Sequence, residues 1–464
     1  MSTTNASAPV RPGQVIRVSV HGLGHSGEGV GRYEGLTIFV PGGVPGDMLS
    51  AKVIEVKKNY ARAVLVEVLE PSPDRVAPPC PVVGECGGCQ LQHVSYDAQL
   101  RLKHQQVADA IVRLGKLEGV TIHPTLGMND PWHYRNKAQF PVGLRSGQIV
   151  AGFFAPGTHR IVDIEHCNIQ HPLGNEIMAA AKDLARQFGV PIYDERTHKG
   201  VLRHVLARVG RGTGEAMAVL VTNGPEFPAA AKFAKALLER VPALVSVVQN
   251  INPEQTNVVL GRKSKVLAGK DHIIDHIGDL EFAISPVSFF QVNPAQTEVL
   301  YGKALAYAGL TGNETVLDVY CGIGTISLFL ARQAREVIGI EVVPPAIEDA
   351  RENAARNRVT NARFICGDAA VEMPKFAEEG VRADVIVVDP PRAGCDASVL
   401  QAMATVRPER IVYVSCNPAS LARDLGILSG LGYRVVEVQP VDMFPHTSHV
   451  ECVARLERVT ADQM

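Results

Sequence analysis

TVLDVYCGIGT, residues 315–325, begins a series of five apolar segments that decides the fold of this chain; the series continues with REVIGIEVV (335–343), ARFICGDA (362–369), ADVIVVDPPRAG (383–394) and RIVYVSCNP (410–418). Each segment is a short strand-like run that ends in a loop, and near-continuous apolar runs are typical of buried parallel strands. Two further extended segments, 433–444 and 448–458, are expected to complete the sheet as an antiparallel pair. We therefore predict a doubly wound α/β domain over residues 285–464, with ligands at the carboxyl ends of its strands.

The first strand-to-helix turn has the composition of a ligand-binding turn, with Asp318, Tyr320, Gly322, Gly324 and Thr325. Glycine lets the backbone approach a ligand closely, although tight packing would also explain two glycines. The sequence C-G-I-G-T is not G-x-G-x-x-G, which disfavours a pyrophosphate. Glu341 ends the second strand at the spacing at which an acidic group binds a ribose diol, and Asp368 ends the third, where it would meet an adenine edge. This pattern fits S-adenosylmethionine and resembles the Rossmann-like class I methyltransferase fold.

The N-terminal region, residues 11–70, reads as short β segments broken by glycines. It resembles the TRAM domain, a small β-barrel of RNA-modifying enzymes. Basic and aromatic residues of its last turn are expected to contact RNA, the alternative being a solvated basic turn: Lys57, Lys58, Tyr60 and Arg62.

Residues 71–284 read as a central α/β insert domain. A helix is expected near 98–115, and packing of this helix on the catalytic domain is an alternative to packing within the insert. Two basic stretches in this insert are expected to contact RNA phosphates and bases. The first contains Trp132, His133, Tyr134, Arg135 and Lys137, and the second contains Arg196, Lys199, Arg203, Arg208 and Arg211. A solvated sheet edge is the alternative interpretation.

Four cysteines at the start of the insert have the pattern of a metal site. Cys80, Cys86 and Cys89 form C-x5-C-x2-C, and Cys167 would supply a fourth thiolate. Four sulfurs satisfy either zinc or an iron-sulfur cluster, and the spacing alone slightly favours zinc.

Composition excludes several classes of protein. The 464 residues carry a formal net charge of -2, which gives no global attraction to nucleic acid, so that any RNA-binding surface must be local. The polar start lacks the apolar core of a signal peptide, and no apolar run is long enough to span a bilayer. Nine cysteines in a chain of this kind argue against a disulfide framework. We expect a cytoplasmic protein with no membrane association.

The residues that follow the fourth and fifth strands indicate which kind of base accepts the methyl group. Asp389-Pro-Pro-Arg392 has arginine where amino-group methylation motifs have an aromatic ring, which weakens that interpretation. Cytosine-5 RNA methyltransferases usually carry a cysteine beside the proline of this motif, whereas Cys395 lies several residues beyond Pro391, which weakens that interpretation too. Cys416 sits where a strand runs into an Asn-Pro turn, as a nucleophile would, or else it is a small buried apolar side chain. Thiolate addition at carbon 6 of uracil would make carbon 5 nucleophilic, and a general base must then remove the proton at carbon 5. Glu451 is the candidate base, unless it is a strand charge that faces water.

Six motifs, in this order, resemble those of the RNA uracil-5 methyltransferase family: FFQVNP (289–294), DVYCGIGT (318–325), GIEVVPPAIEDA (339–350), VDPPRAG (388–394), YVSCNP (413–418) and FPHTSHVE (444–451). The resemblance covers nearly the whole chain. It implies that Cys416 is the nucleophile and Glu451 the base. It also implies a set of cofactor and base-orienting contacts: Gln291, Tyr320, Glu341, Asp368 and Asp389.

The resemblance also bears on the metal and the substrate. Ribosomal-RNA members of the family hold a [4Fe-4S] cluster through this cysteine pattern, whereas tRNA-specific relatives lack both the cluster and the TRAM domain. We therefore expect a [4Fe-4S] cluster and methylation of a uridine in 23S ribosomal RNA, with no protein partner implied. The alternatives are uracil-5 methylation of tRNA and a non-catalytic RNA-binding iron-sulfur protein.

Overall fold

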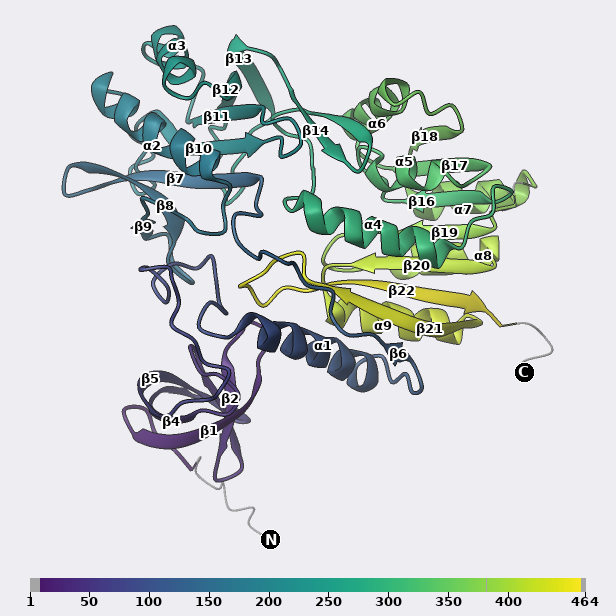
Figure 1. Ribbon diagram of the computed structural model, residues 1–464, viewed down its shortest axis with the longest axis horizontal. Helices are drawn as coiled ribbons and strands as arrows, with labels where there is room; N and C mark the ends of the chain where they lie inside the picture. Colours follow the sequence, from purple (N-terminus) through teal and green to yellow (C-terminus); the bar gives the residue numbers. More distant parts are fainter. Residues whose placement is uncertain (1–8, 381, 460–464) are drawn as a thin grey trace.

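The computed structural model describes residues 9–380 and 382–459 and contains a closed barrel and two larger sheets (Figure 1). The barrel has the strand order β1-β2-β3-β5-β4. Its strands are β1 (Val15–Leu23), β2 (Gly29–Tyr33), β3 (Leu36–Val40), β4 (Met48–Val56) and β5 (Tyr60–Glu70). Alternate side chains of β1 to β4 point into a small apolar core, as the period of two in these segments predicts.

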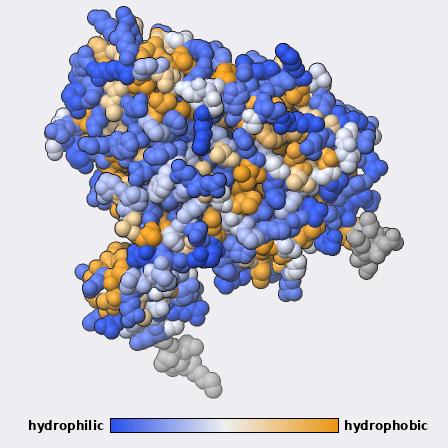
Figure 2. Space-filling model, in the orientation of Figure 1, coloured by the Kyte–Doolittle hydropathy of each residue, from blue (hydrophilic) through white to orange (hydrophobic). Residues whose placement is uncertain are grey.

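The outer face of the barrel is not uniformly polar. Exposed apolar side chains from β4 and β5 gather there, namely Ile54, Val64, Val66 and Leu69. Figure 2 shows this apolar side of the barrel against an otherwise mixed surface.

The central sheet has seven strands in the order β13-β12-β11-β10-β7-β8-β9. They are β7 (Lys137–Arg145), β8 (Gln148–Phe154), β9 (Ile161–Asp163), β10 (Leu202–Val209), β11 (Ala216–Thr222), β12 (Leu244–Ile251) and β13 (Lys263–Gly269). Two helices, α2 (Pro172–Gln187) and α3 (Ala230–Arg240), share one hydrophobic core with this sheet. The loop that carries Cys80, Cys86 and Cys89 lies between the barrel and this sheet in the chain.

The catalytic sheet has eight strands in the order β18-β17-β16-β19-β20-β22-β21-β6. They are β16 (Thr315–Val319), β17 (Glu336–Glu341), β18 (Ala362–Cys366), β19 (Val385–Val388), β20 (Arg410–Ser415), β21 (Tyr433–Val441), β22 (Glu451–Arg458) and β6 (Thr121–Ile122). The five predicted strands from β16 to β20 run parallel, and β22 pairs antiparallel with both β20 and β21. The fold class predicted from the sequence is therefore confirmed.

Helices cover both faces of the catalytic sheet, which explains why β16 is buried at every residue. One face packs against α4 (Pro294–Ala308), α5 (Thr325–Ala331) and α6 (Pro344–Arg356). The other packs against α7 (Ala369–Glu378), α8 (Ala397–Val406), α9 (Pro418–Gly430) and α1 (Tyr96–Arg113). The contribution of α1 comes mainly from Val107 and Ile111, which lie in the same core as Leu421 and Leu425 of α9.

Segments from before residue 285 thus help to build the catalytic unit. Besides α1, the two-residue strand β6 pairs with β21. A hairpin of β14 (Ile273–Ile277) and β15 (Leu280–Ile284) buries its apolar side chains in the core that contains α4 and α5.

Candidate active site

The local sequence of the Asn-Pro turn explains why Cys416 stands at the edge of the sheet. Strand β20 ends at Ser415, and Asn417 caps α9 by accepting a hydrogen bond from the Ala419 backbone N–H at 3.1 Å. Pro418 occupies the first turn of the helix, where its missing N–H costs nothing. Cys416 is therefore held in a short link between strand and helix, and its side chain is half-buried.

Glu451 lies beside Cys416 because of the register of two antiparallel strands. Ser415, the last residue of β20, pairs with Cys452 of β22. Because the strands are antiparallel, Cys416, which follows Ser415, lies beside Glu451, which precedes Cys452. Glu451 is the first residue of β22 and is buried, with 5% of its surface exposed. The strand-surface alternative for Glu451 is therefore wrong, and the nucleophile and base candidates lie on neighbouring strand ends.

Burial and like charges shift the titration of three groups at this edge. Burial, then the Glu451 and Asp389 carboxylates, raise the pKa of the Cys416 thiol to about 11, and the Arg392 guanidinium opposes that rise. Burial and Asp389 raise the pKa of Glu451 to about 8, again opposed by Arg392. Burial raises the pKa of Asp389 to about 6. Perturbed titration of several groups in one place is a common property of active sites.

Arg392 is a residue of this edge to which the sequence analysis gave no role. Its backbone carbonyl accepts hydrogen bonds from Asn417 Nδ2 and Ser420 Oγ, both at 3.1 Å, which ties the Pro-Pro-Arg loop to the Cys416 turn. Its Nη2 lies 2.9 Å from Nδ1 of His449. Burial and Arg392 lower the pKa of His449 to about 4, so this ring is neutral near pH 7. The sequence did contain a signal for this residue, because Arg392 stands in the Asp389-Pro-Pro motif where amino-group methyltransferases have an aromatic ring.

The glycines of the first turn serve different purposes. Gly324 is required for packing, because a Cβ there would meet the Phe364 ring at 3.0 Å. A Cβ at Gly322 would meet nothing within 4 Å, so its backbone borders open space. Tyr320 has a φ of 64°, a left-handed conformation that is unfavourable for a residue with a side chain. The turn therefore offers an open backbone edge at Gly322, as a bound nucleoside requires.

Polar groups of neighbouring strands converge on this turn. Glu341 Oε2 accepts a hydrogen bond from the Gly322 N–H at 3.3 Å. Asp318 is buried, and within the described part of the chain its Oδ1 has no hydrogen-bond partner. Burial raises the pKa of Asp318 to about 7. Asp368 is exposed at the end of β18, and its Oδ1 accepts from the Ala370 N–H at 2.9 Å.

Gln291 is largely buried and lies before α4, within the motif FFQVNP. Close to it is Tyr301 of α4, a site residue that the sequence analysis missed. The Tyr301 hydroxyl lies 2.9 Å from Thr325 Oγ1, and burial together with Asp389 raises its pKa above the usual range. Tyr301 thus links the cofactor turn to the strand that carries Asp389. The apolar helical pattern around Tyr301 gave no sign of this role.

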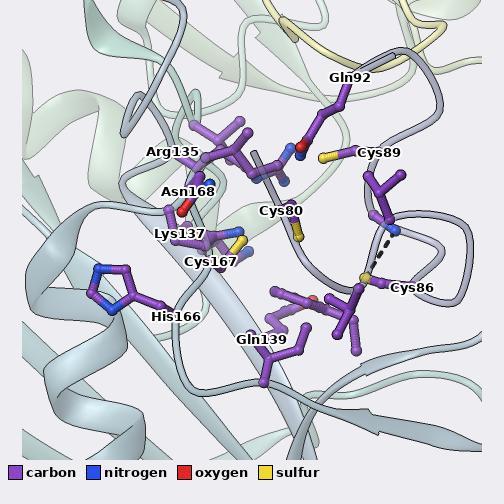
Figure 3. A pocket seen from close by; sticks show the side chains of 18 residues that line it. Cys80, Cys86, Cys89, Gln92, Arg135, Lys137, Gln139, His166, Cys167 and Asn168 are labelled. Carbon is purple, nitrogen blue, oxygen red and sulfur yellow. Dashed lines mark hydrogen bonds between the residues drawn. The ribbon is translucent and has the colours of Figure 1, made fainter. Parts of the chain in front are cut away.

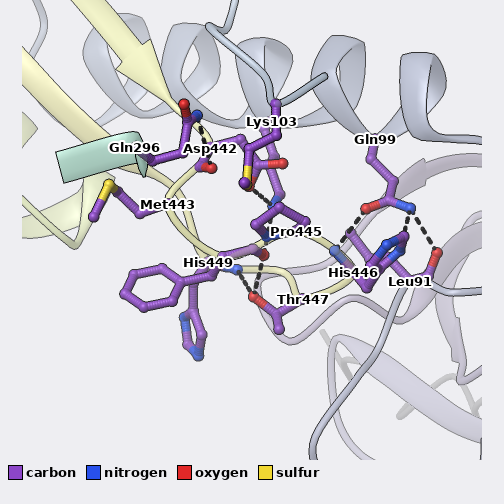
Figure 4. Close-up of polar contacts among 12 residues, drawn as sticks. Leu91, Gln99, Lys103, Gln296, Asp442, Met443, Pro445, His446, Thr447 and His449 are labelled. Carbon is purple, nitrogen blue, oxygen red and sulfur yellow. Dashed lines mark hydrogen bonds and ion pairs between the residues drawn. The ribbon is translucent and has the colours of Figure 1, made fainter. Parts of the chain in front are cut away.

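The loop of residues 442–449, which precedes Glu451, is fixed by polar contacts from several distant segments (Figure 4). Lys103 Nζ lies 2.5 Å from Asp442 Oδ1 and donates to the Phe444 carbonyl at 3.1 Å. Gln99 Nε2 donates to Nδ1 of His446 at 3.2 Å, and Gln99 Oε1 accepts from the His446 N–H at 2.9 Å. The backbone N–H groups of residues 90 and 91 both donate to the His446 carbonyl. The loop that follows the cysteine pattern is therefore joined directly to the loop that leads to Glu451.

All four predicted ligand cysteines line one cavity of about 350 Å³ (Figure 3). Three come from the loop of residues 80–89, and Cys167 follows β9. Arg135 and Lys137 line the same cavity, and burial together with the Arg208 and Arg135 guanidinium groups lowers the pKa of Lys137 to about 7. Over residues 9–380 and 382–459, no three His, Cys, Asp or Glu side chains gather closely enough to hold one metal ion.

Several residues of the two basic stretches are buried, and the expectation that they are exposed is wrong. Arg203 and Arg208 are 5% and 3% exposed, and their guanidinium groups donate to backbone carbonyls. Both lie on β10, an interior strand, where the surrounding apolar residues draw the whole segment into the core. Tyr134 is also buried and donates to the Pro445 carbonyl at 3.0 Å, and Trp132 stacks on His446. The exposed basic residues that remain from the second stretch are Arg196, Lys199 and Arg211.

Comparison with known proteins agrees with this architecture. The tRNA (uracil-5-)-methyltransferase family model matches residues 249–459, and the TRAM domain model matches residues 9–66. An uncharacterized RNA methyltransferase of Halalkalibacterium halodurans is 54% identical over 97% of this chain and 98% of its own. One from Clostridium tetani is 50% identical over 96% of each chain. The solved tRNA (uracil-54, C5)-methyltransferase of Pyrococcus abyssi, in complex with S-adenosyl-L-homocysteine, is 29% identical with a TM-score of 0.76 and covers 95% of this chain and 100% of its own.

The fold and the site together define a class I methyltransferase that depends on S-adenosylmethionine. The chain belongs to the RNA uracil-5 methyltransferase family, as the motifs predicted. It is an enzyme that methylates RNA, and its barrel is a TRAM domain. Among the residues that the structure describes, no helix has both the length and the apolar character needed to cross a membrane.

Proposed function

We propose that this enzyme transfers a methyl group to carbon 5 of a uridine in 23S ribosomal RNA through a covalent bond between Cys416 and carbon 6. The observation that carries the proposal is the pairing of β20 with β22, which puts a thiol and a buried carboxylate side by side. Cys416 adds to carbon 6, carbon 5 takes the methyl group from the sulfonium, and Glu451 accepts the carbon 5 proton as the thiolate leaves. Arg392 favours the thiolate by its charge.

In this proposal S-adenosylmethionine, when bound, supplies the electrophilic methyl group. Glu341 binds the ribose, Asp368 meets the adenine edge, and Tyr320 packs on the ligand beside the open Gly322 backbone. Gln291 and Asp389, which border the Tyr301 hydroxyl, orient the cofactor and the uracil.

We also propose that Cys80, Cys86, Cys89 and Cys167 hold a [4Fe-4S] cluster. A single zinc ion needs its four sulfurs at about 2.3 Å, whereas a cluster needs a cavity between them, which these thiols border. The cluster would brace the loop that contacts His446 and is not required to supply electrons. None of the nine cysteines, all of which lie within the described residues, forms a disulfide, and we propose the cytosol as the compartment.

Methylation of tRNA is the second candidate. The Pyrococcus abyssi enzyme is named for uracil 54 of tRNA. Its structure matches 95% of this chain, and a match of that extent includes the barrel. The barrel alone therefore does not separate the two substrates, and the preference for ribosomal RNA rests on the cysteine pattern.

Mapping 5-methyluridine in 23S ribosomal RNA and in tRNA, from cells with and without the gene, tests the assignment. Loss of one or more methylated uridines from 23S ribosomal RNA alone is expected. Loss from tRNA alone would replace the first candidate by the second, and no loss from either RNA would reject both.

A further inference from the structure

A second hollow lies in the central domain, apart from the catalytic edge. It consists of two adjoining cavities of about 640 and 390 Å³, which share Phe154, His159, Glu195, Arg203 and His204. One wall is the backbone of Gly87 and Gly88, from the loop that carries the ligand cysteines. We call it the β10 hollow, after the strand that supplies Arg203 and His204.

A β-bulge directs two consecutive side chains of β10 into this hollow. Leu202 pairs with Thr222 and His204 pairs with Val221, so Arg203 is the extra residue. Successive side chains of a regular strand point to opposite faces, whereas a bulge re-aims them, and bulges are over-represented next to functional sites. Arg203 and His204 both line the hollow for this reason.

Both of these side chains are more than nine-tenths buried, yet each keeps an unused polar atom. Arg203 is 5% exposed and His204 is 8% exposed. Within the described residues, neither Nε of Arg203 nor Nδ1 of His204 has a hydrogen-bond partner. Buried polar atoms without partners are uncommon in folded proteins and call for an explanation, of which a ligand is one.

The rest of the hollow has the chemistry of a nucleotide site. Phe154 and His159 stack on each other, with ring centroids 5.2 Å apart and planes at 22°, so that an outer face of this stack can serve as the platform for a third ring. Gln139 adds an amide to the lining. Arg160 and Arg196 line the outer cavity, with side chains 57% and 90% exposed. Aromatic faces with polar edge groups and outer arginines are the elements by which proteins bind unstacked RNA bases.

We propose that the β10 hollow binds an unstacked nucleotide of single-stranded RNA, outside the catalytic pocket. The base stacks on the Phe154–His159 platform, His204 and Arg203 bind its polar edge, and the outer arginines contact phosphate. The proposal rests on the RNA-binding function of the family and not on the choice of 23S ribosomal RNA. Because Gly87 donates to the Phe154 carbonyl at 3.0 Å, the bound nucleotide also touches the segment that orders the ligand cysteines.

Photocrosslinking of the full-length protein, with its cluster retained, tests this site. The probe is a mixed-sequence single-stranded RNA 12-mer that contains 4-thiouridine, and crosslinked peptides are identified by mass spectrometry. Crosslinks to residues 153–159 are expected. Crosslinks confined to the barrel and the catalytic edge would overturn the proposal.

Affinity measurements with the same RNA compare variants of the hollow with a control variant elsewhere in the chain. His159→Ala and Phe154→Ala should each weaken binding by about 5- to 100-fold, the usual contribution of one stacked base. His272→Ala is the control, since His272 pairs with Asp271 at 2.6 Å just as His159 pairs with Glu195 at 2.6 Å. His159 is well exposed, so its variant is expected to fold even where Phe154→Ala does not. Wild-type affinity in His159→Ala would reject the site, whatever RNA the enzyme methylates.

Discussion

Lys103 of α1 and Asp442 of the loop before Glu451 form an ion pair of 2.5 Å, with side chains 1% and 0% exposed. The pair joins a helix from before the central sheet to the loop that leads to the strand with the proposed base. Two charges in such a place are stable only together, because either one alone would be buried without compensation.

Lys103→Met should therefore destabilise the protein by about 3–5 kcal/mol, as removal of one partner of a buried pair does. Urea denaturation measures the free energy of unfolding. Lys103→Met combined with Asp442→Asn should recover part of the loss, because no charge is then left alone. A loss of stability below about 1 kcal/mol in the single variant, as is typical of an exposed ion pair, would contradict the conclusion that neither charge is stable in this place without the other.

Cys416→Ala should abolish methyl transfer and leave the affinity for S-adenosylmethionine unchanged, because only the acceptor side of the reaction loses a group. An RNA with 5-fluorouridine at the target has no removable proton at carbon 5, so the wild-type enzyme should remain covalently attached to it. Denaturing gel electrophoresis detects the adduct. An active Cys416→Ala enzyme, or the absence of an adduct with wild type, would reject covalent catalysis.

Glu451→Gln keeps the shape of the side chain and removes its basicity. Turnover should fall by about 10²- to 10⁴-fold while a methylated covalent RNA adduct accumulates, since addition and transfer precede proton removal. Labelled methyl on a denaturing gel reports the adduct and the turnover together. Wild-type turnover in this variant would place the base elsewhere.

The raised pKa of Glu451 also predicts a pH dependence. With a pKa of about 8, the free carboxyl is protonated at lower pH and cannot accept the carbon 5 proton. Protonation of the Cys416 thiol, whose pKa is about 11, already lowers the wild-type kcat/KM as the pH falls. Protonation of Glu451 should therefore add a steeper limb below about pH 8. In Glu451→Gln this limb should disappear from the residual activity.

The same carboxyl should make the folded protein less stable at high pH. Because its pKa is raised in the folded state, the stability it contributes is present below its ordinary pKa of 4.5 and is lost as the pH rises through about 8. Thermal unfolding should show Glu451→Gln to be more stable than wild type at pH 9, with a smaller difference at pH 5. An equal difference at both pH values would contradict the burial of an ionisable group.

The reactivity of Cys416 gives an independent test of its surroundings. Arg392 lowers the pKa of the thiol and Glu451 raises it. The midpoint pH of alkylation by iodoacetamide should therefore move up in Arg392→Ala and down in Glu451→Gln. Arg392→Lys keeps the charge and should stay near the wild-type midpoint. Shifts in the same direction for the two charge-removing variants would be inconsistent with this arrangement.

Protein purified without oxygen should be brown and contain about four irons per chain. Replacing Cys86 with Ser should remove iron, because one of four thiolate ligands is lost. Cys366→Ala is the control, since Cys366 is exposed and lies on the catalytic sheet. Stoichiometric zinc without iron or sulfide in the wild-type preparation would refute the cluster.

The catalytic sheet was predictable because its signals are local. Each parallel strand is an apolar run with a polar residue at or near its end, as in Asp318 and Glu341, and the end of the run gives the position in the sheet. Glu451 could be placed near Cys416 because its segment was expected to join the same sheet as an extended strand, within reach of the edge that carries Cys416.

Other features depend on contacts that one segment does not encode. The apolar face of α1 would fit many surfaces, and Thr121–Ile122 is too short to be read as a strand. Charge predicted exposure for Arg203, whereas a bulge and the packing of β10 bury it. Arg392 and Tyr301 lie at the active site because of tertiary contacts, which no periodicity reveals.

Trp132 is the only tryptophan of the chain, and its ring stacks on His446 with centroids 3.8 Å apart. Its fluorescence therefore reports a single place, the loop that leads to Glu451. Any rearrangement of that loop on binding of cofactor or RNA changes the environment of this one emitter. The enzyme thus contains a built-in optical probe, and stopped-flow emission can follow the loop in unlabelled wild-type protein during turnover.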